Sequence, residues 1–359
     1  MKVIIRIFAT GILVLLSTSF LAAYIPPSET FIFAIAGLGF PFFWIMAFLM
    51  FAFLLIIKER LLSIISAVIL IVSAQTFFQY FNISLFHEDK ESQYSILDFN
   101  TFGLKYPDTV TNQIENQRDF NNELNNKNYS VICFQEYPMK GSKHAKFYQQ
   151  LDEGLNLPYK TLSHYYWDQK NTDYILVTTS KFLILDEQVF TQDGLNFAMY
   201  SDIKFPEKII RVYNVHFQSV KLTSERKLLM INRHVNLKSI KVQVREAIRK
   251  LRIAFLYREK QAGILEESIR KSPYPVIIAG DFNDTPASFV YRIMKRGLKD
   301  ASSSKSFGFK RTYKFSRFPL QIDYLIHSPE IETDDYHTVK QHLSDHYAIT
   351  SRFSLKEQD

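Results

Sequence analysis

The fold is decided by one stretch of sequence, VIIAGDFNDTP at residues 276–286. Four apolar residues run into Gly280, which is typical of a strand that is buried on both faces. Asp281 and Asn283 follow where this strand ends, and functional side chains are often carried by loops that a rigid scaffold positions. The alternative interpretation is a plain strand with a polar loop, and the rest of the chain decides between the two.

The 359 residues fall into two parts of different composition. Residues 1–81 are dominated by Leu, Ile, Phe and Ala, whereas the remainder has the mixed composition of a water-soluble domain. The part after residue 81 is long enough for one large core. The single cysteine, Cys133, lies in an apolar run, which excludes an internal disulfide framework and predicts a small buried core residue.

Three apolar runs in the first part predict membrane-spanning helices over residues 7–24, 31–57 and 61–81. A helix needs about 20 apolar residues to cross a bilayer, and the second run is longer and would tilt or extend past it. A cleaved signal peptide is the alternative for the first run. We expect a linker over residues 82–93 and a folded domain over residues 94–359.

The positions of the basic residues predict how the three spans are oriented. Lys2 and Arg6 precede the first run, and Lys58 and Arg60 lie between the second and the third. Basic residues stay on the cytoplasmic side, so the N-terminus and the turn at residues 58–60 are expected in the cytoplasm. Three crossings then carry the folded domain to the extracytoplasmic side, periplasmic or extracellular.

The net charge of +7 is concentrated in one predicted helix. Between Lys221 and Lys260 there are twelve Lys or Arg against three Glu. A basic stripe over Lys241–Arg252 runs beside apolar residues at helical spacing. This pattern predicts an amphipathic helix, which either is simply solvated or contacts an anionic surface such as lipid headgroups or a nucleic-acid backbone.

Polar side chains recur at the ends of six predicted strands. They are Asn100; Glu136; Asn214 and His216; Asp281 and Asn283; Asp323; and Asp345 and His346. Oxygen ligands without cysteine favour Mg²⁺ or Mn²⁺ over a structural zinc ion. Such an ion can neutralise phosphate oxygens while an aspartate orients or deprotonates the attacking water, so the set suits hydrolysis of a phosphate ester.

The chain resembles the endonuclease/exonuclease/phosphatase superfamily, which includes deoxyribonuclease-I-like and abasic-site nucleases, bacterial sphingomyelinases and inositol-phosphate phosphatases. The resemblance covers residues 94 to 356 and rests on the order of six motifs: Asn100, Gln135-Glu136, Asn214-x-His216, Gly280-Asp281-Phe282-Asn283, Ile322-Asp323-Tyr324 and Ser344-Asp345-His346. The N-terminal part looks like that of a membrane-anchored branch of bacterial members. The resemblance implies an α/β fold, a four-layer α/β/β/α sandwich of two mixed sheets between helices.

The resemblance also implies a metal ion and an attacking water at the strand ends. Glu136 would be the principal metal ligand, with Asn100 beside it and Asp345 at the edge of the ion. Asp281 would align or activate the water, and Asn283 would hold the phosphate.

Two histidines complete the implied site. His346 would face the phosphate as an acid or base, with Asp323 fixing its tautomer. His216 would contact the scissile phosphate from the opposite side, and Asn214 would bind substrate. Gln321 departs from the family pattern, because many members carry an arginine there.

The expected function is that of a membrane-anchored, divalent-metal-dependent phosphoester hydrolase, with phosphodiester bonds favoured. Nucleic acids, phospholipid or sphingolipid headgroups and small phosphate esters stay open as substrates. The expected partners are the bilayer through residues 7–81 and the substrate; no obligate protein partner is inferred. The alternative is a non-catalytic membrane interaction protein that retains the fold, but such a protein would be expected to lose metal and phosphate residues.

Overall fold

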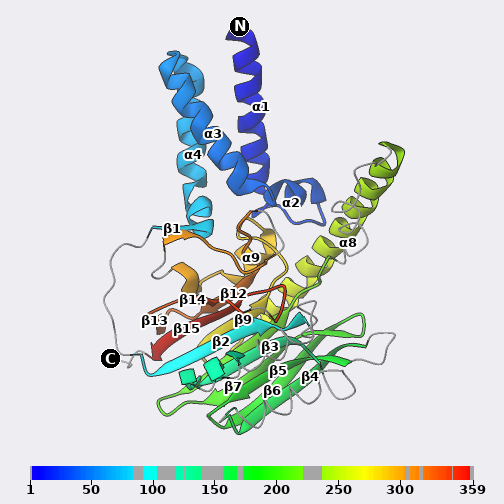
Figure 1. Ribbon diagram of the computed structural model, residues 1–359, viewed down its shortest axis with the longest axis vertical. Helices are drawn as coiled ribbons and strands as arrows, with labels where there is room; N and C mark the ends of the chain where they lie inside the picture. The colour runs from blue at the N-terminus through cyan, green and yellow to red at the C-terminus, as the bar shows by residue number, and fades with distance from the viewer. Residues whose placement is uncertain are drawn as a thin grey trace. The chain divides into compact units, whose positions relative to one another are not determined.

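The structure is a computed structural model of the chain (Figure 1). It describes residues 2–83, 92–102, 119–120, 122–124, 126–138, 155, 157–167, 173–220, 237–303, 307–314, 318–341 and 343–355. These residues form two compact units, which we describe separately.

The first unit comprises Met1–Gln79, Gln218–Gly263 and Asn283–Ile293. Its N-terminal part contains the helices α1 (Lys2–Leu21), α2 (Phe31–Gly37), α3 (Phe40–Ile56) and α4 (Arg60–Tyr80). Its two later segments carry most of the long helix α8 (Leu237–Arg270) and nearly all of the short helix α9 (Phe289–Met294).

The second apolar run is not one helix, which corrects the prediction for residues 31–57. It is broken into α2 and α3, whose axes meet at 68°. Gly37 and Gly39 flank the break, and Pro41 lies in the first turn of α3, where its missing N–H breaks no helical hydrogen bond. By length and composition, α1 and α4 could each cross a membrane, and α2 with α3 would make a third span if the bent pair counts as one.

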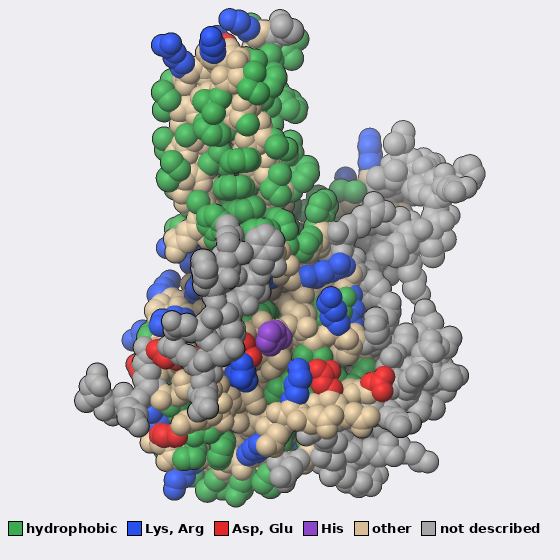
Figure 2. Space-filling model, turned by 60° about the vertical axis from the view of Figure 1, so that its left-hand side comes forward, with side chains coloured by type: hydrophobic (Ala, Val, Ile, Leu, Met, Phe, Trp, Pro, Cys, Tyr) green, Lys and Arg blue, Asp and Glu red, His purple; other side chains and the backbone are tan. Residues whose placement is uncertain are grey.

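The surface of α1, α3 and α4 is apolar along most of its length (Figure 2). Ile4 of α1 is 71% exposed and Ile71 of α4 is 74% exposed, which is unfavourable in water but suits contact with lipid. The hydroxyl groups of Ser63, Ser66 and Ser73 each donate to the carbonyl oxygen four residues earlier, at 2.9, 2.7 and 2.7 Å. These three hydroxyl groups are therefore satisfied by nearby backbone carbonyls, an arrangement that would suit a bilayer.

The predicted amphipathic helix is present as α8, although residues 222–236 lie outside the described residues. Its second half packs through Phe255, which is 1% exposed. In its first half the apolar side chains of Val244 and Ile248 are 51% and 39% exposed, next to exposed Lys241 and Arg245. That half is amphipathic without being buried, and its contact with an anionic surface stays a prediction.

The second unit comprises Tyr80–Phe217, Ile264–Phe282 and Met294–Asp359 and contains two large mixed sheets (Figure 1). The seven-stranded sheet has the order β13-β15-β2-β3-β5-β4, with β14 also on β15. Its strands are β2 (Tyr94–Asn100), β3 (Val131–Pro138), β4 (Tyr159–Trp167), β5 (Asp173–Ser180), β13 (Ile331–Thr333), β14 (His337–Val339) and β15 (Ala348–Leu355).

The six-stranded sheet has the order β10-β12-β9-β8-β7-β6. Its strands are β6 (Ile184–Gln192), β7 (Leu195–Lys204), β8 (Ile209–His216), β9 (Val276–Asp281), β10 (Lys299–Asp300) and β12 (Asp323–His327). A small separate sheet pairs β1 (Phe81–Ile83) with β11 (Phe307–Phe309), so the predicted linker begins inside a strand; its residues 84–91 lie outside the described part.

The main core lies between the two large sheets. It joins Ile96 and Cys133 of one sheet to Val212 and Ile277 of the other, which confirms the buried position of Cys133. A second core covers the outer face of the seven-stranded sheet, where Phe120 of a helical segment packs. On the six-stranded sheet, the Tyr213 hydroxyl is 2.9 Å from Ser268 Oγ of α8. Helical segments thus cover both sheets, and the predicted sandwich class is confirmed.

Gly280 is required where β8 and β9 run parallel. Its φ is 154°, and it pairs in register with Val215. A Cβ atom on Gly280 would lie 2.0 Å from the carbonyl oxygen of Val215, which is backbone and cannot rotate away.

We predict that Gly280→Ala lowers the free energy of unfolding by about 3 kcal/mol or more, because the added methyl overlaps the neighbouring strand. Thermal unfolding of the full chain in detergent, followed by circular dichroism, measures this change. Gly263→Ala is the matched control: Gly263 lies inside α8 with open space around it, and alanine there should stabilise by up to about 1 kcal/mol. Equal unfolding temperatures for Gly280→Ala and the unmodified chain would contradict the close approach.

A buried carboxylate beside β15 links folding to pH. Asp335 accepts hydrogen bonds from the backbone N–H of Arg352 at 2.7 Å and from its Nε at 2.6 Å. Burial acts to raise the pKa of Asp335, but the hydrogen bonds and charge of Arg352 outweigh it and lower the pKa. A lowered folded-state pKa stabilises the fold above the ordinary aspartate range, and this stabilisation is lost as the pH falls through the lowered pKa.

We predict that Asp335→Asn costs about 1 kcal/mol at neutral pH, a modest value because the Arg352 side chain is 47% exposed and screened by water. The difference from the unmodified chain should shrink as the pH falls towards about 3. Unfolding temperatures measured across this range test the claim. Asp193→Asn, in the exposed turn between β6 and β7, is the control, and a cost independent of pH would refute the linkage.

Candidate active site

Three of the predicted site residues form one row across the six-stranded sheet. Asp281 is the last residue of β9, and it pairs with His216, the last residue of β8. On its other side Asp281 pairs with Asp323, the first residue of β12. The register of the sheet therefore brings together three side chains that are far apart in sequence.

The seven-stranded sheet supplies further polar side chains. Asn100 ends β2, and its Nδ2 donates to Asp281 Oδ2 at 3.0 Å, which joins the two sheets at the site. Ser344 Oγ donates to the Asn100 carbonyl oxygen at 2.7 Å and so holds the loop that carries Asp345 and His346.

Glu136 has an unusual backbone for its residue type. Its φ is 48°, in the left-handed region, and the pairing of β3 with β5 shifts register between Phe134 and Tyr137. A bulge of this kind re-aims a side chain, and such strained residues concentrate at functional sites. The Glu136 side chain stays 21% exposed, so it is the more open of the carboxylates around His216.

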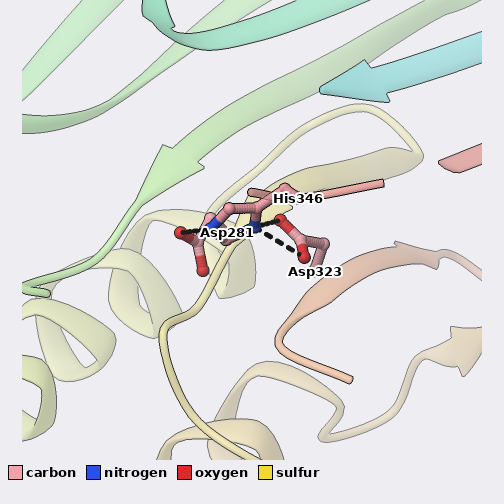
Figure 3. A group of neighbouring side chains, drawn as sticks. All are labelled: Asp281, Asp323 and His346. Carbon is pink, nitrogen blue, oxygen red and sulfur yellow. Dashed lines mark hydrogen bonds and ion pairs between the residues drawn. The ribbon is translucent and has the colours of Figure 1, made fainter. Parts of the chain in front are cut away.

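His346 and Asp323 form a hydrogen-bonded pair (Figure 3). His346 Nδ1 lies 2.9 and 3.0 Å from the two carboxylate oxygens of Asp323, which fixes the tautomer with the proton on Nδ1. The other ring nitrogen, Nε2, lies 3.8 Å from Asp281 Oδ2 and 3.9 Å from Asp345 Oδ1. The predicted pairing of His346 with Asp323 is thus present, with Nε2 facing the remaining carboxylates.

The charge of His346 is set by its neighbours. Burial acts to lower the pKa of His346, but the charges of Asp323, Asp281 and Asp345 and the hydrogen bond to Asp323 raise the pKa to about 10. The imidazole is therefore a cation at neutral pH in this arrangement and can donate a proton from Nε2.

His216 shares one of these carboxylates, Asp281, and also lies close to Glu136. Its Nε2 lies 3.5 Å from Glu136 Oε1 and 3.7 Å from Asp281 Oδ2, and its side chain is 1% exposed. Asp281 Oδ2 is thus close to Nε2 of both histidines; the contact of His216 with the scissile phosphate stays a prediction.

Ligand atoms of Asp281, Asp323 and His346 lie within 4.8 Å of one another, so this group could hold a metal ion. Asp323 and His346 already bind each other, however, and a metal held by all three would have to replace that hydrogen bond. Carboxylate oxygens outside the pair fit a divalent cation without that cost. The ligand set Glu136, Asn100 and Asp345 stays a prediction; the side-chain oxygen of Asn100 already accepts from Phe102 N–H at 3.0 Å.

Two other predicted residues have different surroundings. Asn214 is fully buried; its Nδ2 donates to the carbonyl oxygens of Phe134 and Val177 at 3.2 and 2.9 Å, so it ties the two sheets together. Asn283 has a φ of 52°, a conformation that asparagine tolerates better than most residues. The roles of Asn214 in binding substrate and of Asn283 in holding phosphate stay predictions.

The structure adds residues that the sequence did not single out. Asp98, two residues before Asn100 on β2, is buried and accepts from Gln135 Nε2 at 2.6 Å. Burial raises the pKa of Asp98 well above its usual range. The period of two along a strand places Asp98 on the same face as Asn100 and could have found it.

Lys314 and Tyr313 also belong to this region. Lys314 Nζ donates to the Ser344 carbonyl oxygen at 2.7 Å, and burial lowers the pKa of Lys314 to about 8. The Tyr313 ring meets the His346 ring edge-on, with 5.3 Å between centroids. No motif in the sequence marks either residue, because each reaches the site through a pairing with a distant part of the chain.

Comparison with known families finds two family models that match the chain. The family model described as "Endonuclease/Exonuclease/phosphatase family" matches residues 99–346. A second model, described as a domain of unknown function, matches residues 2–80. No curated protein sequence matches the chain significantly.

Solved structures share the fold at low identity. An endonuclease/exonuclease/phosphatase family protein from Leptotrichia buccalis C-1013-b is 15% identical, with a TM-score of 0.53 over 73% of this chain and 100% of that one. A protein of the same description from Beutenbergia cavernae DSM 12333 is 14% identical, with a TM-score of 0.53 over 74% of this chain and 72% of that one. Humanized D. rerio TDP2 is 16% identical, with a TM-score of 0.50 over 73% and 98%. At these identities the likeness shows the fold alone.

Proposed function

Because the chain belongs to the endonuclease/exonuclease/phosphatase family, whose members are metal-dependent phosphoesterases, we propose that it hydrolyses phosphodiester bonds with Mg²⁺ or Mn²⁺. The observation that carries the proposal is the position of Asp281. It lies in a row with His216 and Asp323, and Nε2 of the protonated His346 points at it. A buried base and a buried acid therefore share one small space, as phosphoester hydrolysis requires.

Each side chain has a distinct task in the proposed reaction. A bound divalent ion would neutralise charge on the phosphate oxygens, with Glu136 and Asp345 among its ligands. Asp281 orients the attacking water and accepts its proton, since Asn100 fixes one of its oxygens at 3.0 Å. His346 donates from Nε2 to a phosphoryl or leaving-group oxygen while Asp323 holds its ring. His216 stabilises the phosphate on the side of Glu136.

The substrate class separates into three candidates, namely nucleic acid, lipid headgroup and small phosphate ester. All three present the same phosphoester chemistry to Asp281 and His346. A substrate panel distinguishes them, because they differ in what surrounds the phosphate and not in the reacting atoms.

We further propose that the chain is anchored in a membrane by three crossings, with its N-terminus in the cytoplasm. Arg6 of α1 and Glu59, between α3 and α4, form an ion pair at 3.0 Å. This contact supports the arrangement because α3 must return to the end of the bundle where α1 begins. Lys2, Arg6, Lys58 and Arg60 then share one end, as the positive-inside rule expects. The folded domain after residue 81 would then emerge on the extracytoplasmic side.

We predict that the full chain in lipid nanodiscs hydrolyses bis(p-nitrophenyl) phosphate with Mg²⁺ or Mn²⁺ and loses this activity in EDTA. His346→Ala should lower kcat by about 100-fold or more, because it removes the acid. His337→Ala is the matched control, since its side chain is 63% exposed. The same preparations offered p-nitrophenyl phosphate, plasmid DNA, RNA and lipid vesicles identify the substrate class.

If none of the substrates is hydrolysed in a metal-dependent way, the proposed hydrolase activity is refuted. Equal activity of His346→Ala and His337→Ala would refute the site while leaving an enzyme.

We predict that a reporter fused after Asp359 lies on the extracytoplasmic side in a bacterial host, because three crossings place the C-terminus opposite the N-terminus. Alkaline phosphatase fused there should be active, and green fluorescent protein fused there should not fluoresce. Separate fusions to alkaline phosphatase and to green fluorescent protein distinguish the extracytoplasmic side from the cytoplasm. The same reporters inserted after Glu59 are the internal control and should report the cytoplasm. Fluorescence from the fusion after Asp359 would contradict the three-crossing arrangement.

A further inference from the structure

Arg258 is a fully buried arginine in α8 that holds two loops of the first compact unit. Its side chain is 1% exposed, and its Nε lies 3.2 Å from Asp284 Oδ2. Its Nη1 donates to the carbonyl oxygen of Gln218 at 3.0 Å. Along the chain, Gln218 comes two residues after His216 and Asp284 comes three residues after Asp281. One guanidinium therefore holds the segments that directly follow two strands of the candidate site.

A second side chain of the same helix supports Gln218. Gln261 lies three residues after Arg258, which puts both on one face of α8. Gln261 is 4% exposed, and its Oε1 accepts from the Gln218 backbone N–H at 2.9 Å. Both backbone polar groups of Gln218 are thus held by α8, so the path of the chain after β8 depends on this helix.

Asp284 links the guanidinium to the segment around Asn283. Asp284 is 3% exposed, and its Oδ1 accepts from Thr285 N–H at 3.0 Å. Burial raises the pKa of Asp284, and the charge of Arg258 opposes that shift. A buried arginine and a buried carboxylate are each unfavourable alone, so the pair fixes the geometry of the segment that begins at Asn283.

The residue next to Arg258 connects α8 to the N-terminal helices. Glu259 accepts two hydrogen bonds from Ser28, one from its backbone N–H at 2.7 Å and one from its Oγ at 2.5 Å. Ser28 lies between α1 and α2, in the connection that follows the first apolar helix. Two adjacent residues of one helix, Arg258 and Glu259, thus hold the segment at Asp284 and the connection at Ser28.

The N-terminal helices also contact the Asp284 segment directly. A Cβ atom on Gly37 of α2 would lie 3.5 Å from the carbonyl oxygen of Ala287, so the two backbones pass close together. The Arg292 guanidinium of α9 stacks on the ring of Tyr24 at 3.9 Å. The segment Asn283–Ile293 is consequently part of the same compact unit as α1 to α4.

We propose that the apolar N-terminal part positions the segment that carries Asn283, through the Ser28–Glu259 and Arg258–Asp284 contacts within the first compact unit. The proposal rests on the proposed function, in which Asn283 holds the phosphate. Arg258 and Glu259 are positioning residues, because they act through Asp284 and Ser28 and do not touch the substrate.

The proposal is tested on the full chain in nanodiscs with Glu259→Gln, Ser28→Ala and Arg258→Lys. Lysine keeps the charge of Arg258 but lacks the planar guanidinium whose Nε and Nη1 contact Asp284 and Gln218 at the same time. Glu267→Gln is the matched control, because Glu267 is on the same helix, is 60% exposed and pairs with Lys271 on the surface. Hydrogen exchange of the backbone amides of residues 283–288 is the first readout, and kcat and KM are the second.

We expect faster exchange in residues 283–288 for all three variants and unchanged exchange for Glu267→Gln. Arg258→Lys should lower kcat/KM by about 10-fold to 100-fold, the effect of misplacing a substrate-holding group, while the unfolding temperature of Glu259→Gln stays close to that of the unmodified chain. Unchanged exchange and turnover in Glu259→Gln and Ser28→Ala would overturn the proposal. Faster exchange together with an unmodified chain that has no turnover would refute the proposed function and leave the positioning contacts standing.

Discussion

The structure of the site depends on the burial of Asp281. Its side chain is 1% exposed, and an ionised carboxylate in that position is unfavourable unless donors and cations surround it. Asn100 donates to it from the other sheet, and His216 and His346 face it from two sides. The same need explains why Asp323 accompanies His346, since its carboxylate keeps the imidazole protonated beside Asp281. An Asp281 carboxylate that is held in this way is positioned to accept a proton.

Much of the site could be predicted from the sequence because strand ends are local signals. The run before Gly280 identified β9, and the alternation before His216 identified β8, so their last residues were known to be near the sheet edge. Which residues meet there was not local information. The register that sets Asp323 opposite Asp281 comes from strand pairing, and Lys314 reaches Ser344 through contacts that no pattern in either segment records.

The N-terminal part was predicted in outline and corrected in detail. Hydropathy located the apolar runs, but it averages over a window and therefore missed the break between α2 and α3. Gly37, Gly39 and Pro41 carried that signal. The buried pair of Arg258 and Asp284 was equally hidden, because the sequence pattern predicts an amphipathic helix with a basic, solvated face and no motif marks Asp284. The first compact unit therefore combines residues that composition alone assigned to separate parts.

In the proposed reaction, the carboxylates around Asp281 form a metal-dependent hydrolytic site. A crystal of the full chain grown with Mn²⁺ and a phosphate analogue tests it most directly, because anomalous scattering locates the ion without reference to activity. We expect an anomalous peak bound by Glu136, with the analogue between the ion and His346. A peak ligated by both Asp323 and His346, with their hydrogen bond broken, would refute the proposed metal site, and so would an ion bound away from Glu136 and Asp281.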